Sequence, residues 1–239
     1  MRKPLLFLLS ALGCAAAMPA HADNLSVRGA AYYGLYQIRG YSDPVFFNGF
    51  KDSGKSEGLG VGSTYTFGRA FIDLGLDYFQ INDGIQGFDF QRTDLSFTGG
   101  AKIIDWLGAF GGVRRAWQSP SNSALVDAPF RSSNGWNEVG VFAGPSFGPF
   151  ALGPIRLSGS VAYNLNWVKG PGANTFFSTD GDARQYNGIG AKLRFGLAKT
   201  PHAIELRYQR FANDKPDELD YNESYLYLGY IFNWSLTNK

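Results

Sequence analysis

The sequence predicts an all-β fold, a transmembrane antiparallel up-and-down β-barrel of about ten strands. The composition supports this, because the 239 residues include 31 Gly, 20 Phe and 13 Tyr but only two Met, which favours strands and turns over helices. Segments with alternating apolar and polar residues recur along the chain, and the connections between them alternate between long and short. Both features are expected of a barrel that crosses a membrane. If two segments are misassigned, the strand number is eight or twelve.

The first 22 residues have the three parts of a secretory signal peptide. Arg2 and Lys3 supply the positive charge, Leu5 to Ala11 form a short apolar run, and Ala20-His21-Ala22 is a small-x-small cleavage site. The apolar run is far shorter than the ~20 residues that a membrane-spanning helix needs. We therefore expect a cleaved signal peptide, residues 1–22, followed by a barrel domain, residues 23–239.

A lipoprotein signal ending at Cys14 is the alternative, although Ala11 occupies the place where such signals more often have Leu. Cleavage after residue 22 removes the only cysteine and leaves 20 basic and 20 acidic residues. The remaining chain can form no disulfide, and its balanced charge gives no indication of a nucleic-acid partner.

The first five expected strands show the alternation least regularly. The last of them is the weakest assignment, because Arg114 and Arg115 are adjacent and blur the two faces. A strand places successive side chains on opposite faces, so a regular strand here has one apolar and one polar face. These strands span residues 25–38, 57–67, 69–80, 93–103 and 106–118.

The last five expected strands alternate clearly. From Ile155 to Trp167 every odd position is apolar or Gly, whereas the even positions hold Arg, Ser, Ala and Asn. Ile204, Leu206 and Tyr208 likewise oppose polar neighbours. The strands span residues 136–148, 154–168, 186–198, 202–212 and 223–235.

The lengths of the connections favour a membrane barrel over a soluble β-sandwich. About eighteen residues separate the first two expected strands, only Gly68 the next two, and a dozen lie around Asp83-Gly84. Residues 119–135 and 169–185 are again long, and their neighbouring connections are short. A soluble β-sandwich is not expected to alternate long and short connections in this way. We therefore predict five external loops, with four periplasmic turns and both chain ends on the inner side.

Tryptophan placement agrees with a barrel that crosses two membrane interfaces. All five tryptophans fall at or near the ends of expected strands, where amphipathic rings meet lipid headgroups. The alternative is the general preference of aromatic residues for strands. The expected interfacial girdle consists of Trp106, Trp117, Trp136, Trp167 and Trp234.

The final strand resembles the assembly signal of Gram-negative outer-membrane β-barrel proteins. The pattern is Tyr-x-Gly-x-x-Phe-x-Trp, formed here by Tyr227, Gly229, Phe232 and Trp234. Five residues follow Trp234. The resemblance names a superclass and no particular member. It implies residence in the bacterial outer membrane, insertion by the barrel-assembly machinery, and contact with outer-membrane lipids and lipopolysaccharide.

Because side chains alternate between the two faces of each strand, the positions opposite the apolar face point into the barrel, and these positions hold charged residues of both signs. One interpretation is a plug of crossing ion pairs that holds the barrel rigid, and the other is a narrow charged conduit. We favour the plug, because buried charges persist when paired and an eight- to ten-stranded barrel is nearly filled by its own side chains. The expected interior cluster comprises Arg28, Asp73, Asp77, Asp94, Lys102, Glu138, Arg156, Lys192, Arg194, Glu205 and Arg207.

Enzymatic and metal sites find little support. After signal cleavage the only histidine is His202, which parity places on the lipid face at the periplasmic rim beside Pro201. No cysteine and no histidine pair is available for a metal, and no cofactor is expected. Asp180-Gly181-Asp182 has only part of a calcium loop.

Any specificity is therefore expected in the loops. Residues 39–56 carry aromatic side chains that cap the barrel mouth, pack on lipopolysaccharide or meet a partner. Glu223 follows the acidic connection 213–222, which we interpret as a solvated loop, with divalent-ion bridging to lipid phosphates as the alternative. The favoured function is a structural or surface-interaction barrel that presents five loops. A narrow porin-like channel is the first alternative and a lipid-modifying outer-membrane enzyme the second.

Overall fold

The computed structural model describes residues 24–40, 50–85, 88–120, 136–169, 184–212 and 221–236. Nearly all of these residues lie in ten long β-strands. None of them forms a helix long and apolar enough to cross a membrane. The strands are β1 (Asn24–Gly40), β2 (Phe50–Phe67), β3 (Ala70–Ile85), β4 (Phe88–Lys102), β5 (Leu107–Pro120), β6 (Trp136–Leu152), β7 (Ile155–Lys169), β8 (Arg184–Leu197), β9 (His202–Ala212) and β10 (Tyr221–Ser235).

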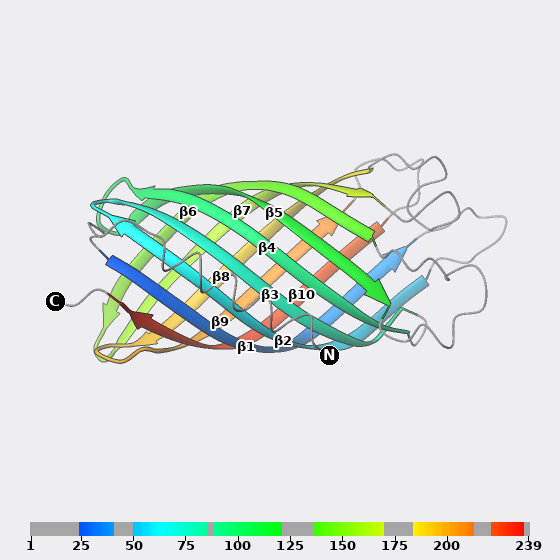
Figure 1. The fold of residues 1–239 in the computed structure, drawn as a ribbon, viewed down its shortest axis with the longest axis horizontal. Coiled ribbons are helices and arrows are strands. Elements are labelled where there is room, and N and C mark those ends of the chain that lie inside the picture. The colour runs from blue at the N-terminus through cyan, green and yellow to red at the C-terminus, as the bar shows by residue number, and fades with distance from the viewer. Residues whose placement is uncertain are drawn as a thin grey trace.

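The strands form one closed barrel in which each strand pairs antiparallel with its neighbours in the chain. The barrel closes between β1 and β10, whose register runs from Ser26 opposite Ser235 to Gly40 opposite Tyr221. Closure leaves no strand edge unpaired, which a sheet surrounded by lipid requires. The predicted fold class, an up-and-down antiparallel barrel of ten strands, is confirmed (Figure 1).

The two ends of the barrel differ in their connections. At one end, here called the turn end, residues 68–69, 103–106, 153–154 and 198–201 join the strands, and β1 begins and β10 ends there. Gly68, Gly153 and Lys199 adopt left-handed backbone angles in three of these turns. The opposite end, called the loop end, carries the remaining connections.

One predicted connection at the loop end was wrong. The sequence indicated about a dozen residues around Asp83-Gly84, but β3 continues to Ile85 and β4 begins at Phe88. The pairing shifts between Ile81 and Ile85, so β3 carries a bulge near its end. The bulge interrupts the two-residue alternation, which is why the sequence pattern placed the strand end too early. β2 likewise begins at Phe50 rather than residue 57.

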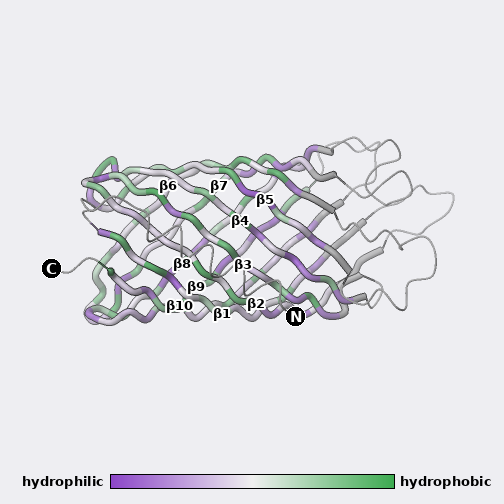
Figure 2. Tube along the Cα trace, in the orientation of Figure 1, coloured by the Kyte–Doolittle hydropathy of each residue, from purple (hydrophilic) through white to green (hydrophobic). Residues whose placement is uncertain are grey.

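Alternation sorts the side chains between the outside and the lumen. Large apolar side chains such as Leu59, Tyr163 and Leu228 are more than half exposed on the outside. Figure 2 shows hydrophobic and hydrophilic residues interleaved along the strands. We call the exposed outward side chains the outer apolar belt. The core, by contrast, lies inside the barrel and is built largely from aromatic and charged residues.

Candidate functional site

The lumen near the loop end is centred on Arg92 of β4, which is only 1% exposed. Its Nε donates to both oxygens of Asp94, at 3.0 and 3.1 Å. Nη2 donates to Glu138 Oε2 at 2.9 Å, and Nη1 donates to the Tyr225 hydroxyl at 2.7 Å. Nη1 also lies 3.5 Å from Glu223 Oε1. One guanidinium therefore joins side chains from β4 and β6 to β10.

A second cation completes this group. Arg114 Nη2 of β5 donates to Glu138 Oε1 at 2.6 Å, and its guanidinium lies over the Phe211 ring of β9 at 4.8 Å. Gln118 Oε1 accepts from Arg92 Nη1 at 3.2 Å. We call this group the Arg92 cluster: Arg92, Asp94, Arg114, Gln118, Glu138, Glu223 and Tyr225. Since β10 and β4 lie on different sides of the barrel, the cluster crosses the lumen.

Aromatic rings fill the lumen next to the Arg92 cluster. Phe79 of β3 stacks on Tyr227 of β10 with centroids 4.6 Å apart, and Tyr32 of β1 lies 5.7 Å from Phe79. Tyr225 packs against Tyr36 at 5.1 Å. All five side chains are buried. They come from three strands that face inward, so apolar area is buried inside the barrel as well as exposed outside it.

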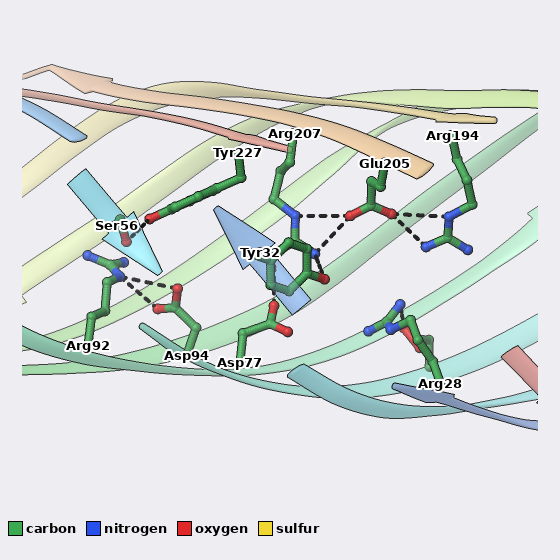
Figure 3. A network of polar contacts seen from close by, with 11 residues as sticks. Arg28, Tyr32, Ser56, Asp77, Arg92, Asp94, Arg194, Glu205, Arg207 and Tyr227 are labelled. Carbon is green, nitrogen blue, oxygen red and sulfur yellow. Dashed lines mark hydrogen bonds and ion pairs between the residues drawn. The ribbon is translucent and has the colours of Figure 1, made fainter. Parts of the chain in front are cut away.

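A second ionic group lies farther toward the turn end, centred on Arg207 of β9. Its Nη1 donates to Asp77 Oδ2 of β3 at 2.8 Å, and its Nη2 donates to the Tyr32 hydroxyl at 2.8 Å. Nη2 also donates to Glu205 Oε1 at 3.0 Å. Arg194 Nη2 donates to the other oxygen of Glu205 at 2.6 Å. Figure 3 shows these side chains meeting inside the barrel. We call Tyr32, Asp77, Arg194, Glu205 and Arg207 the Arg207 cluster.

Glycines on β2 make the space that these groups occupy. A Cβ at Gly60 would overlap Asp77 Oδ1, and a Cβ at Gly58 would overlap the Phe79 ring. A Cβ at Gly62 would lie 2.8 Å from the Arg28 guanidinium. The three glycines face the lumen on successive inward positions of one strand. Their absent side chains let Asp77 and Phe79 reach the centre of the barrel.

The lumen nearest the turn end is more open. Arg28 Nη1 lies 3.7 Å from Asp73 Oδ1, and Thr64 donates to Asp73 Oδ2 at 3.1 Å. Lys192 faces inward opposite Arg207 and Ser160, yet it is exposed and forms no ion pair with a described residue. Its inward neighbours include the small residues Ser158 and Ser160 on β7 and Gly190 on β8, and Arg194 follows on β8.

The structure places most of the predicted interior charges inside the barrel. Asp94 and Glu138 belong to the Arg92 cluster; Asp77, Arg194, Glu205 and Arg207 form the Arg207 cluster; Arg28 pairs with Asp73. Lys102 and Arg156 instead lie at the ends of their strands, exposed at the turn end. They form no ion pair with any residue that the structure describes.

The sequence-based list omitted three charged residues of the Arg92 cluster. Arg92 was omitted because the expected strand began at residue 93, although it lies two residues before Asp94 and so on the same face. Arg114 was omitted because of its neighbour Arg115, which faces outward over Trp117 at 4.9 Å. Interpreting Glu223 as part of a solvated loop edge was wrong, because its side chain is buried against Arg92.

The tryptophans face the outside where their side chains are described. Trp106 and Trp234 are exposed at the turn end, and Trp167 is exposed near the loop end. Trp117 lies near the loop end under Arg115. Trp136 begins β6, and its side chain lies outside the described part of the structure. The four described rings thus lie toward both ends of the outer apolar belt.

The residues of the C-terminal pattern face both sides of β10. Tyr227 and Gly229 face the lumen, and a Cβ at Gly229 would lie 2.6 Å from the Tyr32 ring. Phe232 and Trp234 face outward and are exposed. His202 is also on the outside, where its Nδ1 lies 2.6 Å from the Tyr230 hydroxyl. Its ring packs near Phe232, with centroids 5.5 Å apart.

Among the described residues, no group of three or more His, Cys, Asp or Glu side chains is placed to hold a metal ion. Most of the loop residues singled out from the sequence, including Asp180-Gly181-Asp182 and all four acidic residues of 213–222, lie outside the described residues. The arrangement that the structure does describe is therefore a lumen crossed by two ionic clusters, with aromatic rings between them.

No protein-family model matches the sequence, and no curated protein matches it either. Solved structures do resemble the fold. The chain matches the outer membrane protease OmpT from Escherichia coli at TM-score 0.52 and 9% identity, over 93% of this chain and 100% of that one. At this identity the likeness concerns the fold alone.

Two further matches have lower structural similarity. The β domain of the Bordetella autotransporter BrkA aligns at TM-score 0.46 and 17% identity, over 89% of this chain and 100% of that one. An outer membrane channel from Pseudomonas putida F1 aligns at TM-score 0.45 and 11% identity, over 91% of this chain and 100% of that one.

Proposed function

We propose that this chain is an integral outer-membrane barrel with a closed lumen, and that it serves a structural or surface-interaction role through its loop end. The observation that carries the closed lumen is the Arg92 cluster, because one buried guanidinium joins strands on different sides of the barrel. The loop end then lies outside the cell and the turn end faces the periplasm.

The membrane location is supported by the outer surface. Apolar side chains that are more than a third exposed occur on every strand. A soluble protein would expose this apolar surface to water, at a cost of about 25 cal/mol for each Å². In a bilayer the same side chains contact lipid, and the closed hydrogen-bonded barrel leaves no strand edge exposed. The N-terminal signal-like segment and the C-terminal pattern point to the same location.

The alternative of a narrow channel would require both clusters to separate. Opening a path past Arg92 would leave Glu138 and Glu223 without their shared cation in a region that water does not reach. Breaking a buried pair in this way costs about 3–5 kcal/mol. Tyr225 and Tyr227 pack beside the cluster and would have to move as well. The contacts therefore favour a closed lumen over a conducting one.

The alternative of a lipid-modifying enzyme has less support. The only histidine among the described residues, His202, faces outward at the turn end and bonds to Tyr230 rather than to a carboxylate. Its position is remote from the loop end, where outer-leaflet lipid would be met. No described serine or carboxylate is paired with it to form a nucleophile and base.

Current through single molecules in a planar bilayer tests the proposed function. The refolded protein is first shown to be folded by its heat-dependent gel mobility and is then added to the bilayer. We expect a bilayer that contains folded protein and carries no discrete current steps. Reproducible steps with ion selectivity would overturn the closed lumen and identify a porin-like channel.

A further inference from the structure

A hollow of about 540 Å³ lies in the barrel wall. By strand alternation most of its lining residues face outward, and Tyr36, Gly54 and Tyr225 are the inward-facing residues between them. Side chains of four consecutive strands in the barrel, β9, β10, β1 and β2, line it close to the loop end. Small outward residues border the hollow, Ser53 on one side and Ser224 on the other.

The strand register arranges the outward side chains here in two rows. The row nearer the loop end is polar, and in it Ser224 lies opposite both Arg210 and Gln37, while Gln37 lies opposite Ser53. The next row toward the turn end is largely apolar. It consists of Tyr208, Leu226, Leu35 and Lys55 in the same strand order.

The hollow therefore straddles the upper edge of the outer apolar belt. On β9, β10 and β1 the last large apolar outward residues are Tyr208, Leu226 and Leu35, and the polar row follows directly. In a membrane barrel this transition coincides with the level of the lipid headgroups. A ligand in the hollow would meet hydroxyl and amide groups on one side and aliphatic side chains on the other.

Two cations flank the hollow. Lys55 and Arg210 are both exposed, and neither forms an ion pair with a described residue. Three strand spacings separate β2 from β9, which is about 14 Å at the usual distance between strands. The nearest outward acid on the same strand is Glu57, two residues from Lys55. Two unpaired cations at this spacing suit a headgroup that carries more than one phosphate.

We infer that this hollow binds the phosphorylated sugar headgroup of an outer-leaflet glycolipid, lipopolysaccharide. Lys55 and Arg210 contact its phosphates, and Gln37, Ser53 and Ser224 bond to its sugar hydroxyls. Leu35 and Leu226 contact the first carbons of the acyl chains. The inference rests on the proposed function, since it requires that the loop end lies at the outer leaflet.

Binding of purified bis-phosphorylated lipid A to the refolded full barrel in zwitterionic detergent tests the site. Bound lipid is counted by native mass spectrometry. The double variant Lys55→Gln/Arg210→Gln should bind roughly thirtyfold more weakly, because each cation near a charged lipid surface contributes about fivefold to binding. Arg115→Gln is the matched control. It removes an outward arginine near the loop end on β5, on the far side of the barrel, and should retain the wild-type affinity.

A second variant separates shape from charge. Ser224→Phe fills the hollow and leaves both cations in place, so it should also lose lipid A. Dephosphorylated lipid A and phosphatidylglycerol should bind wild-type protein more weakly than lipid A does. Equal losses in Arg115→Gln and in the double variant would overturn the inference, as would full binding by Ser224→Phe. Heat-dependent gel mobility of each variant reports the fold, so a folded barrel without the site would leave the proposed function standing.

Discussion

The two halves of the lumen are built on the same strands but filled differently. Near the loop end the inward side chains are large and fully buried, as with Arg92 and Tyr36. Near the turn end the inward residues include many Ser, Thr and Gly, with rings such as Phe71 and Phe110 among them, and Lys192 is exposed although it faces inward. Alternation along a strand decides which residues face the lumen. Their size and their ability to pair decide whether the lumen is closed.

Charge differs between the halves as well. The Arg92 cluster holds two arginines and three carboxylates. Toward the turn end, the inward-facing strand positions and the rim carry six cations and only three acids among the described residues: Arg28, Lys192, Arg194 and Arg207 inside the barrel and Lys102 and Arg156 at its rim, against Asp73, Asp77 and Glu205. Three cations thus lack a matching acid, and water that enters from the turn end meets a net positive surface.

The largest expected effect is the loss of the central guanidinium. Arg92→Leu leaves Asp94, Glu138 and Glu223 buried around an apolar side chain, and we expect it to lower the free energy of unfolding by about 3–5 kcal/mol. Lys192→Leu is the control in the open half, where an unpaired and exposed cation should change stability by less than about 1 kcal/mol. Urea unfolding followed by tryptophan fluorescence measures both. Equal losses would show that the two halves do not differ.

A smaller effect is expected from adding one methyl group inside the barrel. Gly60→Ala pushes a Cβ into Asp77 and disturbs its pair with Arg207, with an expected cost of about 1–3 kcal/mol. Gly190→Ala also faces the lumen, but the nearest atom, Asn164 Nδ2, would lie 3.4 Å from the new Cβ. That control should remain close to wild type in the same unfolding experiment. A destabilised Gly190→Ala would mean that the lumen beside β8 is as tightly packed as the lumen beside β2.

The smallest expected effect is on the rate at which a thiol in the turn-end half of the lumen is modified. A cysteine replaces Lys192 in a Cys14→Ser background, and thiol reagents of equal size and opposite charge are compared. The remaining excess of cations should make the anionic reagent react roughly tenfold faster than the cationic one. Added salt should reduce the ratio, because it screens the charges. Equal rates for the two reagents at low salt would show that the turn-end lumen has no net positive potential.

The fold could be predicted well from the sequence, because a barrel imposes the same two-residue period on every strand. Ile155 to Trp167 shows this period without interruption. The pattern fails where the period is broken, as at the bulge beyond Ile81, and there the connection was predicted too long. Strand ends near the loops were also placed too far inward, which removed Arg92 from the expected interior.

The interior clusters could be predicted only in part. Parity indicates that Asp94, Glu138 and Arg207 face the lumen, but it does not indicate which of them meet. Partners such as Asp77 and Arg207 lie 130 residues apart and are joined by the closure of the barrel. The separation into a closed and an open half depends on side-chain volumes from several strands at one level. No single segment of sequence contains that information.

The sided reactivity of a cysteine at position 192 tests the closed lumen most directly. The Lys192→Cys protein is inserted into vesicles in one orientation, and a charged thiol reagent that does not cross lipid is added to one side at a time. Lys199→Cys, in an exposed turn, identifies the turn side. We predict that Cys at position 192 reacts from the turn side and stays unmodified when the reagent is on the loop side. Modification at similar rates from both sides would contradict the account, because the reagent would then have passed the Arg92 cluster.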